Sequence, residues 1–156
     1  MPADLKAIVN HTDRTLRIAE NEDYEGAHNG LQMENNGHVK HIAAAVDASL
    51  ATVRLAADTG ADLLVVHHPL FLKGVHGFTT ETPKGRTLHT LARASCALLA
   101  AHTNADQAEG GVSESLALAL GLDDLRPILT APRPALDQLG VLVPVADAAR
   151  RRAALA

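Results

Sequence analysis

The sequence has very little cysteine and very few aromatic residues. Its single cysteine, Cys96, excludes an internal disulfide framework and a zinc finger built on paired cysteines. Aromatic side chains make up only 2% of the 156 residues, so the core must be built from aliphatic side chains. A platform that stacks the bases of single-stranded nucleic acid needs several aromatic rings, and this sequence has too few to supply one.

Long apolar runs and a surplus of positive charge are also missing. No apolar run reaches the roughly 18 residues that a membrane-spanning helix needs, and the N-terminal residues lack the apolar core of a secretory signal. The net charge of −4 argues against binding to the phosphates of nucleic acid. The patterns of P-loops, dinucleotide-binding loops and serine-hydrolase elbows are absent as well. We therefore expect a cytoplasmic protein that binds neither nucleic acid nor a membrane.

The sequence is long enough for a real core and is rich in histidine. A chain of this length buries roughly 68–70% of its unfolded surface on folding. Hydrophobic residues make up 47% of the chain, which argues against wholesale disorder. Nine histidines are several times what packing needs. Metal binding or acid–base chemistry is therefore the first functional hypothesis.

Apolar segments alternate along the chain with segments that carry helix signals. The segment 41–47 is a short apolar strand, and a helix follows it between Ser49 as N-cap and Gly60 just beyond its end. The continuous apolar run 61–66 is typical of a strand buried on both faces of a parallel sheet. Further helices are predicted at 85–95 and 111–120, and a third strand at 96–102. This alternation predicts an α/β fold with an open, mostly parallel sheet flanked by helices.

The composition changes near residue 127, where three prolines lie close together. This predicts a proline-rich linker at 127–137 after a first domain at 1–126. The segment 138–156 has the pattern of a strand and a helix, and this helix stops without a cap or a following strand. We expect it to be the truncated start of a second domain. Truncation predicts an exposed apolar face on the final helix or at the sheet edge.

Polar side chains that can bind metal ions follow all three predicted strands. Asp47 follows the first strand, His67 and His68 follow the second, and His102 and Asp106 follow the third. Ligands of open parallel sheets bind at the carboxyl ends of the strands. Imidazole and carboxylate groups together suit Zn, Fe, Mn, Ni and Co. The sequence therefore predicts a divalent-metal site at this edge.

Each of these features also has a simpler interpretation. Neighbouring residues of a regular strand point to opposite faces, so His67 and His68 could be a solvated pair at a strand end. Pro69 favours an extended backbone at His68, and a bend there would let both rings face one cavity and serve two ions. Asp106 could simply shape a turn. Cys96 is interpreted as a small buried hydrophobe rather than a nucleophile.

Five segments of the sequence together resemble a known family. They are NGLQ (29–32), AVDAS (45–49), GADLLVVHHPLFLKGV (60–75), TPKGR (82–86) and AAHTNADQAEGGVSESLALALGL (100–122). With these motifs in this order, the sequence resembles the GTP cyclohydrolase I type 2 homologue family, also called the NIF-three-like or DUF-thirty-four family. The resemblance covers roughly residues 5–156, and its HHP and HTNAD segments are the most specific.

The resemblance implies an α/β domain with two divalent metal ions per full-length subunit. It also implies ring-like homohexamers whose metal sites face the central cavity. By motif, His67 and His68 are implied to be ligands of different ions, and Asp106 a ligand of one of them. His102 is implied to lie beside the ions, where it is the candidate catalytic residue for moving a proton. The family's other two ligands, a histidine and a glutamate four residues later, match nothing in this sequence.

The resemblance extends to the end of the chain and to function. The segment 138–156 resembles the start of a domain inserted in many members, so the chain is expected to end inside that insertion and to lack the C-terminal half of the fold. The implied function is hydrolase-like chemistry through metal-activated water on a small-molecule substrate. The family name suggests opening of the purine ring of GTP. The alternative is a non-enzymatic protein that binds metal for regulation or delivery, which the missing ligands favour.

Overall fold

The computed structural model describes residues 1–20 and 28–126. The chain divides into a first unit at Met1–Leu125 and a second at Arg126–Ala156. All the described residues except Arg126 belong to the first unit. The linker predicted at 127–137 and the second domain predicted at 138–156 lie outside the described residues, so both stay predictions. Within the described part, no helix is both long and apolar enough to cross a membrane.

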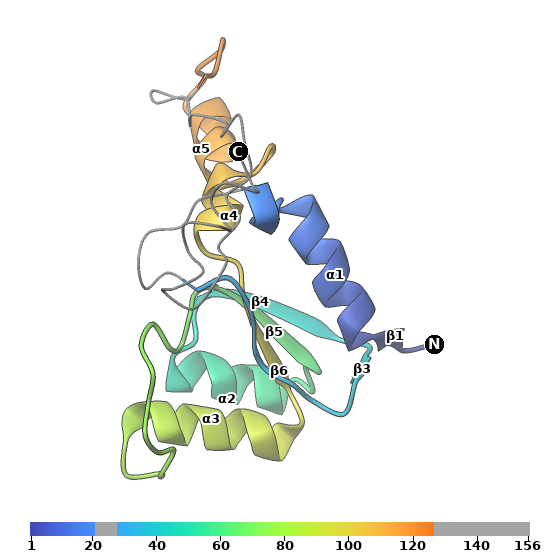
Figure 1. The fold of residues 1–156 in the computed structure, drawn as a ribbon, viewed down its shortest axis with the longest axis vertical. Helices are drawn as coiled ribbons and strands as arrows, with labels where there is room; N and C mark the ends of the chain where they lie inside the picture. Colours follow the sequence, from blue (N-terminus) through green and yellow to red (C-terminus); the bar gives the residue numbers. More distant parts are fainter. Residues whose placement is uncertain (21–27, 127–156) are drawn as a thin grey trace, which may run out of the picture. The chain divides into compact units, whose positions relative to one another are not determined.

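A four-stranded sheet forms the centre of the first unit (Figure 1). Its strands, in spatial order, are β2 (Gly30–Met33), β6 (Ala97–Ala100), β5 (Leu63–His68) and β4 (Ile42–Asp47). The strands β4, β5 and β6 are parallel, and β2 pairs antiparallel with β6. The expected open, mostly parallel sheet flanked by helices is confirmed, whereas the antiparallel edge strand β2 was not predicted.

The strand β5 runs two residues further than its apolar pattern predicts. The prediction placed it at 61–66, but it spans Leu63–His68 because the parallel ladder continues until Asp47 pairs with His68. The strand β6, predicted at 96–102, ends earlier, at Ala100. The chain turns after it into the short helix α4 (Thr103–Gln107), with His102 at the N-cap position.

Two helices cover one face of the sheet (Figure 1). They are α2 (Leu50–Asp58) and α3 (Pro83–Ala94), close to their predicted bounds. The Ser49 hydroxyl accepts a hydrogen bond from the N–H of Thr52 at 3.1 Å, as its predicted N-cap role requires. Val53 and Leu91 from the helices pack against Leu64 of β5 and Leu98 of β6 in one buried aliphatic cluster.

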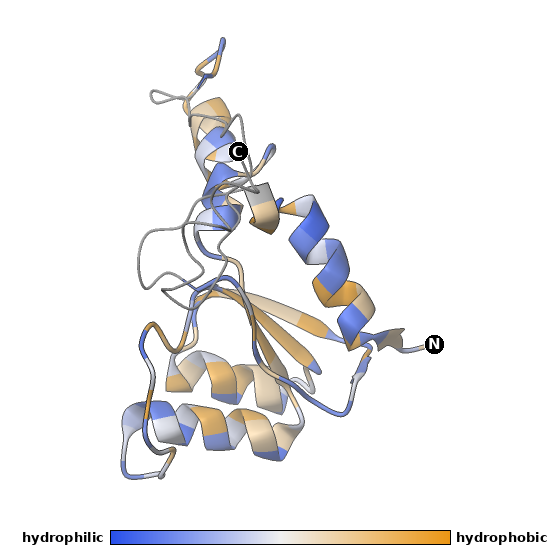
Figure 2. Ribbon diagram, in the orientation of Figure 1, coloured by the Kyte–Doolittle hydropathy of each residue, from blue (hydrophilic) through white to orange (hydrophobic). Residues whose placement is uncertain are grey.

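The helix α1 (Leu5–Thr15) packs against the other face of the sheet and is followed by the 3₁₀ helix η1 (Ile18–Glu20). Leu5 joins Leu63, Ala97 and Leu99 in a second buried cluster. Successive residues of β5 thus serve both faces, and Figure 2 shows its strongly hydrophobic sequence. Beside α1, a two-stranded sheet pairs β1 (Ala3–Asp4) with β3 (His38–Val39).

Cys96 lies just before β6 and is completely buried. Burial raises the pKa of its thiol to about 11, and the nearby Asp62 carboxylate adds to this effect. The thiol therefore stays protonated near neutral pH, and a protonated, inaccessible thiol is a poor nucleophile. The interpretation of Cys96 as a small buried hydrophobe is confirmed.

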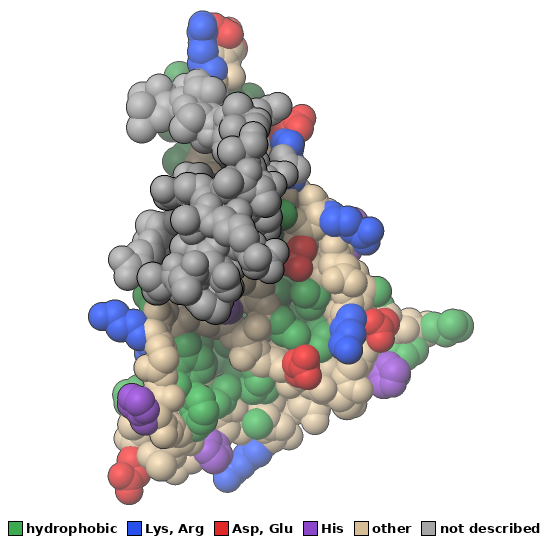
Figure 3. Space-filling model, in the orientation of Figure 1, with side chains coloured by type: hydrophobic (Ala, Val, Ile, Leu, Met, Phe, Trp, Pro, Cys, Tyr) green, Lys and Arg blue, Asp and Glu red, His purple; other side chains and the backbone are tan. Residues whose placement is uncertain are grey.

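Apolar side chains remain exposed at one sheet edge and on one helix. On the edge strand β4, Ile42 and Val46 are 56% and 60% exposed. The helix α5 (Val112–Ala119) has no buried residue, and its Leu116 and Leu118 face solvent. Figure 3 shows hydrophobic side chains gathered on the surface in the region where Figure 1 shows the sheet and its two helices. The described residues thus expose apolar side chains on β4 and α5, whereas the final helix of the sequence prediction lies outside them.

Candidate metal centre

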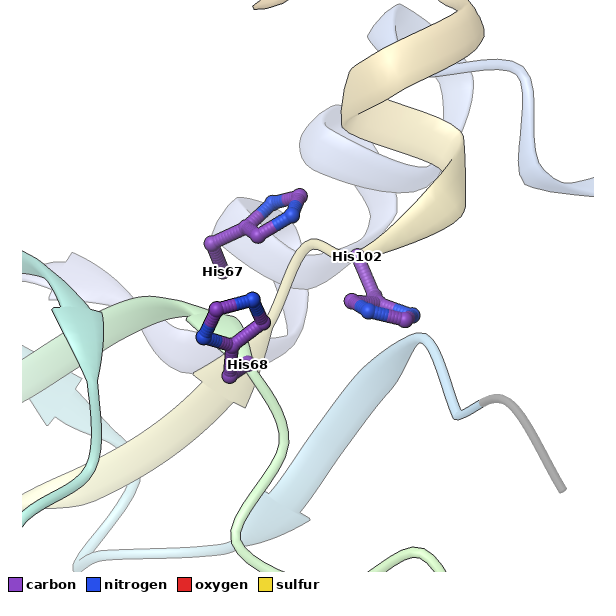
Figure 4. A group of neighbouring side chains, drawn as sticks. All are labelled: His67, His68 and His102. Carbon is purple, nitrogen blue, oxygen red and sulfur yellow. The ribbon is translucent and has the colours of Figure 1, made fainter.

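Three histidines meet at the carboxyl ends of β5 and β6 (Figure 4). His67 and His68 are the last two residues of β5, and His102 precedes α4. One nitrogen from each ring lies within 4.8 Å of the others. The ring centroid of His67 lies 4.9 Å from that of His68 and 5.1 Å from that of His102. The structure thus brings the three histidines that the sequence singled out into one cluster.

His67 and His68 converge although they are neighbours in a strand. Side chains alternate along a strand, so His67 follows Val65 on the α1 face of the sheet. His68 follows Val66 on the opposite face. At the strand end their rings nevertheless stand next to each other, tilted by 59°. The side chain of His67 is 24% exposed and that of His68 is 52% exposed. The geometry therefore favours a shared cluster over a diverging solvated pair.

The Nδ1 atoms of both strand histidines are already engaged. Nδ1 of His67 lies 3.0 Å from the carbonyl oxygen of Ala101, and Nδ1 of His68 lies 2.7 Å from Oδ1 of Asp47. A carbonyl and a carboxylate oxygen can only accept hydrogen bonds, so each Nδ1 carries a proton and donates. In the neutral ring, Nε2 then has a free lone pair. This arrangement is the one that orients metal-ligating histidines in proteins.

Asp106 reaches the cluster from α4. Its Oδ1 lies 3.8 Å from Nε2 of His67, which is too long for a hydrogen bond. Two donor atoms that bind one ion at about 2.0–2.2 Å stand roughly 3–4 Å apart. Asp106 and His67 are therefore spaced so that both could hold the same ion.

The polar residues Asn29 and Gln32, from the NGLQ segment around β2, fix the backbone around these side chains. The side chain of Asn29 accepts a hydrogen bond from the N–H of His102 at 2.7 Å and donates one to the hydroxyl of Thr103 at 2.9 Å. Gln32 accepts from the N–H of Leu70 at 2.7 Å and so holds the segment that follows His68. The β2 edge strand therefore positions both chain turns that carry the histidines.

The donor set fits a divalent transition metal. Three imidazoles and one carboxylate are ligands that Zn, Fe, Mn, Ni and Co accept. Three protein ligands with a fourth position open to a small molecule are typical of catalytic zinc sites. Within residues 1–20 and 28–126, His67, His68 and His102 form the one histidine, cysteine or acidic group found with such spacing.

The other six histidines do not join this group. Nε2 of His89, for example, lies 2.7 Å from the carbonyl oxygen of Phe78, on an exposed part of α3. Asp47 contacts His68 instead of joining the group, and the sequence did not reveal this contact. Its place at a strand end was the available signal, but its pairing with His68 depends on the register of two strands.

Removing the Asp47 carboxylate should weaken the binding of a divalent ion by about 10- to 100-fold, because His68 would lose the acceptor that orients its ring. The measurement is a competition titration of Asp47→Ala against a chromophoric chelator. Asp58→Ala, which removes an exposed carboxylate at the end of α2, is the matched control. Equal affinities for the parent and Asp47→Ala would show that Asp47 does not support the site.

A comparison with protein families agrees with the motifs. Residues 3–152 match the sequence model of a family described as Duf34/NIF3 (NGG1p interacting factor 3). The chain belongs to the Duf34/NIF3 family. The resemblance inferred from the five motifs is thereby confirmed.

Individual Duf34/NIF3 relatives match only with part of their length. The "GTP cyclohydrolase 1 type 2 homolog" of Streptomyces coelicolor is 48% identical over 99 residues, which cover 64% of this chain and 35% of the relative. The protein of the same name from Bacillus subtilis is 35% identical over 135 residues, covering 84% and 35%. The chain thus spans about a third of the length of these curated relatives.

Solved Duf34/NIF3 structures share the fold of the described unit. The crystal structure of a Bacillus cereus protein related to NIF3 has a TM-score of 0.71 and 31% sequence identity. The match covers 79% of this chain and 34% of that protein. The NIF-three-like α/β fold is therefore confirmed for the part of the family that this chain represents.

Proposed function

We propose that the chain binds divalent metal at the cluster of His67, His68 and Asp106 and contributes it to a dinuclear, hydrolase-like centre. The observation that carries the proposal is the state of the two strand histidines. Each has its Nδ1 committed to an acceptor and its Nε2 available beside a third imidazole. Family membership supports the same site.

In this proposal the ligands divide between two ions. His67 and Asp106 share one ion, supported by the 3.8 Å between their donor atoms, and His68 serves the second. Two-metal hydrolytic centres hold their ions about 3.5–4 Å apart, and the 4.9 Å between the two rings is compatible with that spacing. When bound, such ions supply a nucleophile by lowering the pKa of a water molecule.

His102 is proposed to move the proton. Its ring lies 5.1 Å from that of His67 and 5.9 Å from that of His68, and Asn29 holds its backbone. A positioned imidazole close to a reacting group is the commonest general acid or base. His102 lies at the N-cap position of α4, beside the two strand histidines, where its ring could accept or give a proton.

An open pocket near the end of β5 is the proposed place for a small-molecule substrate, and none of the candidate metal-binding side chains lines it. It has a volume of about 400 Å³, and its lining includes Gln32, Phe71 and Lys73. Gln32 also holds Leu70, two residues beyond His68, so the cavity begins close to the strand end. Pockets of this size bind small organic ligands.

The proposed assembly is a homo-oligomer, a hexameric ring as the resemblance implies. The exposed apolar residues of β4, Ile42 and Val46, support association of the subunits.

A second candidate function is metal binding without turnover, for regulation or delivery. The described donors favour it, because three imidazoles and one carboxylate are few ligands for two ions. The chain could hold one ion and pass it on without catalysing a reaction. Like the first proposal, this candidate predicts that the chain binds a divalent ion through these residues. Unlike the first proposal, it predicts no turnover of a substrate.

Turnover of GTP with added Mn²⁺, Fe²⁺ or Zn²⁺ separates the two functions. The first proposal predicts hydrolysis or ring opening that His68→Ala abolishes. It also predicts that His102→Gln loses about 10²- to 10⁴-fold in rate, the range for a general acid or base, while metal affinity is retained. Metal binding without turnover of GTP would support the second function. A His102→Gln variant that loses the metal would make His102 a ligand instead.

A further inference from the structure

A second cavity lies between α2 and α3, and it shares no residue with the metal centre. Its volume is about 350 Å³. Arg54 of α2 lines it, and α3 contributes Arg86, His89 and Arg93. These α3 positions are spaced by three, four and seven residues, so helical geometry places them on one stripe. Figure 1 shows α2 and α3 side by side on the same face of the sheet.

The lining of this groove is strongly cationic. It contains three guanidinium groups, one imidazole and the hydroxyls of Thr80 and Thr90, and no carboxylate. The chain as a whole has a net charge of −4, so this concentration of positive charge is local. Within residues 1–20 and 28–126, neither Arg54 nor Arg93 has a side-chain hydrogen bond or an ion pair.

Arg86 is held in place at the edge of the groove. Its Nη1 donates to the carbonyl oxygens of Thr80 and Glu81, both at 3.0 Å. Arginine has five N–H donors, so the bonds from Nη1 leave those on Nε and Nη2 for a ligand. A guanidinium that is already fixed loses little conformational entropy when an anion binds. The groove therefore has one positioned cation, Arg86, and two that have no partner among the residues that the structure describes.

We propose that this groove binds the phosphate group of a small phosphorylated molecule. Guanidinium forks match phosphate oxygens in paired, charge-assisted hydrogen bonds. The Thr80 hydroxyl adds one donor, whereas the Thr90 hydroxyl already donates to the carbonyl oxygen of Arg86 at 2.9 Å. The cavity volume is within the range of small-ligand sites. The site is independent of the metal centre, so it can exist whether or not the proposed hydrolase function holds.

Calorimetric titration with inorganic pyrophosphate tests the site in the full chain after removal of metal by a chelator. We expect saturable binding that weakens as salt is added. Arg54→Gln/Arg93→Gln should reduce the affinity by at least about 10-fold, since each change removes charged hydrogen bonds. Lys6→Gln/Arg14→Gln removes the same charge from exposed positions of α1 and should leave the affinity unchanged.

Three outcomes would overturn the proposal. One is no binding of pyrophosphate by the parent chain. Another is equal loss in both double variants, which would indicate only an effect of net charge. The third is binding to phosphatidylcholine vesicles that contain phosphatidic acid, without binding of free pyrophosphate, which would make the ligand a lipid surface. His68→Ala should bind pyrophosphate like the parent, which separates this test from that of the metal centre.

Discussion

Replacing His68 by alanine should reduce the affinity of the chain for a divalent ion by at least about 100-fold, because the loss of a ligand costs more than the loss of its supporting partner. The change also leaves the Asp47 carboxylate without the ring it now contacts at 2.7 Å. The affinity is measured by competition with a chromophoric chelator under anaerobic, metal-free starting conditions. His67→Ala should behave in the same way.

A control for this experiment must remove an imidazole without touching the cluster. His11 is exposed on α1 and lies outside the group of three, so His11→Ala serves this purpose. Its metal affinity should equal that of the parent. If His68→Ala binds metal as tightly as His11→Ala, His68 is not a ligand, and the same comparison with His67→Ala decides for His67.

Replacing Leu98 by alanine should lower the free energy of unfolding by about 2–5 kcal/mol, the usual cost of a cavity at a buried leucine. Leu98 is fully buried in β6, within the aliphatic cluster formed with α2 and α3. The sequence contains no tryptophan, so unfolding in urea is best followed by far-ultraviolet circular dichroism. A loss of this size is a large part of the stability of a small domain.

The matched control for the core is an exposed leucine of the same unit. Leu55 of α2 is 65% exposed, and Leu55→Ala should change the free energy of unfolding by no more than about 0.5 kcal/mol. If Leu98→Ala lowers the free energy of unfolding as little as Leu55→Ala does, Leu98 is not packed in the aliphatic cluster under α2 and α3.

Local signals in the sequence predicted the elements on the helical face of the sheet. Ser49 and Gly60 bracket α2 as expected, since a side-chain cap and a glycine with φ of 72° are local features. The edge strand β2 was missed because it is short and contains the polar Gln32. The helix predicted at 111–120 is found as α5 at Val112–Ala119, with Gly111 as its N-cap.

The residues of the candidate site were predicted from the sequence, but the hydrogen bonds that hold them in position were not. His67, His68, His102 and Asp106 could be proposed because each follows or ends a strand. The hydrogen bond from the N–H of His102 to Asn29 joins residues 73 positions apart, so no local pattern reveals it. The contact between Asp47 and His68 depends in the same way on strand register. These supporting bonds hold the residues of the proposed metal centre in place, and they join parts of the chain that are far apart in sequence.

The most direct test of the metal centre is anomalous X-ray diffraction from crystals of the chain grown with Mn²⁺ or Zn²⁺. The account predicts an anomalous peak about 2.0–2.3 Å from Nε2 of His67 or His68, with Nδ1 of His68 still bonded to Asp47. Asp106 should be a ligand of the ion held by His67. A metal-bound crystal with no peak at β5, or with the ion on Nδ1 of His68 in place of the Asp47 contact, would contradict the account.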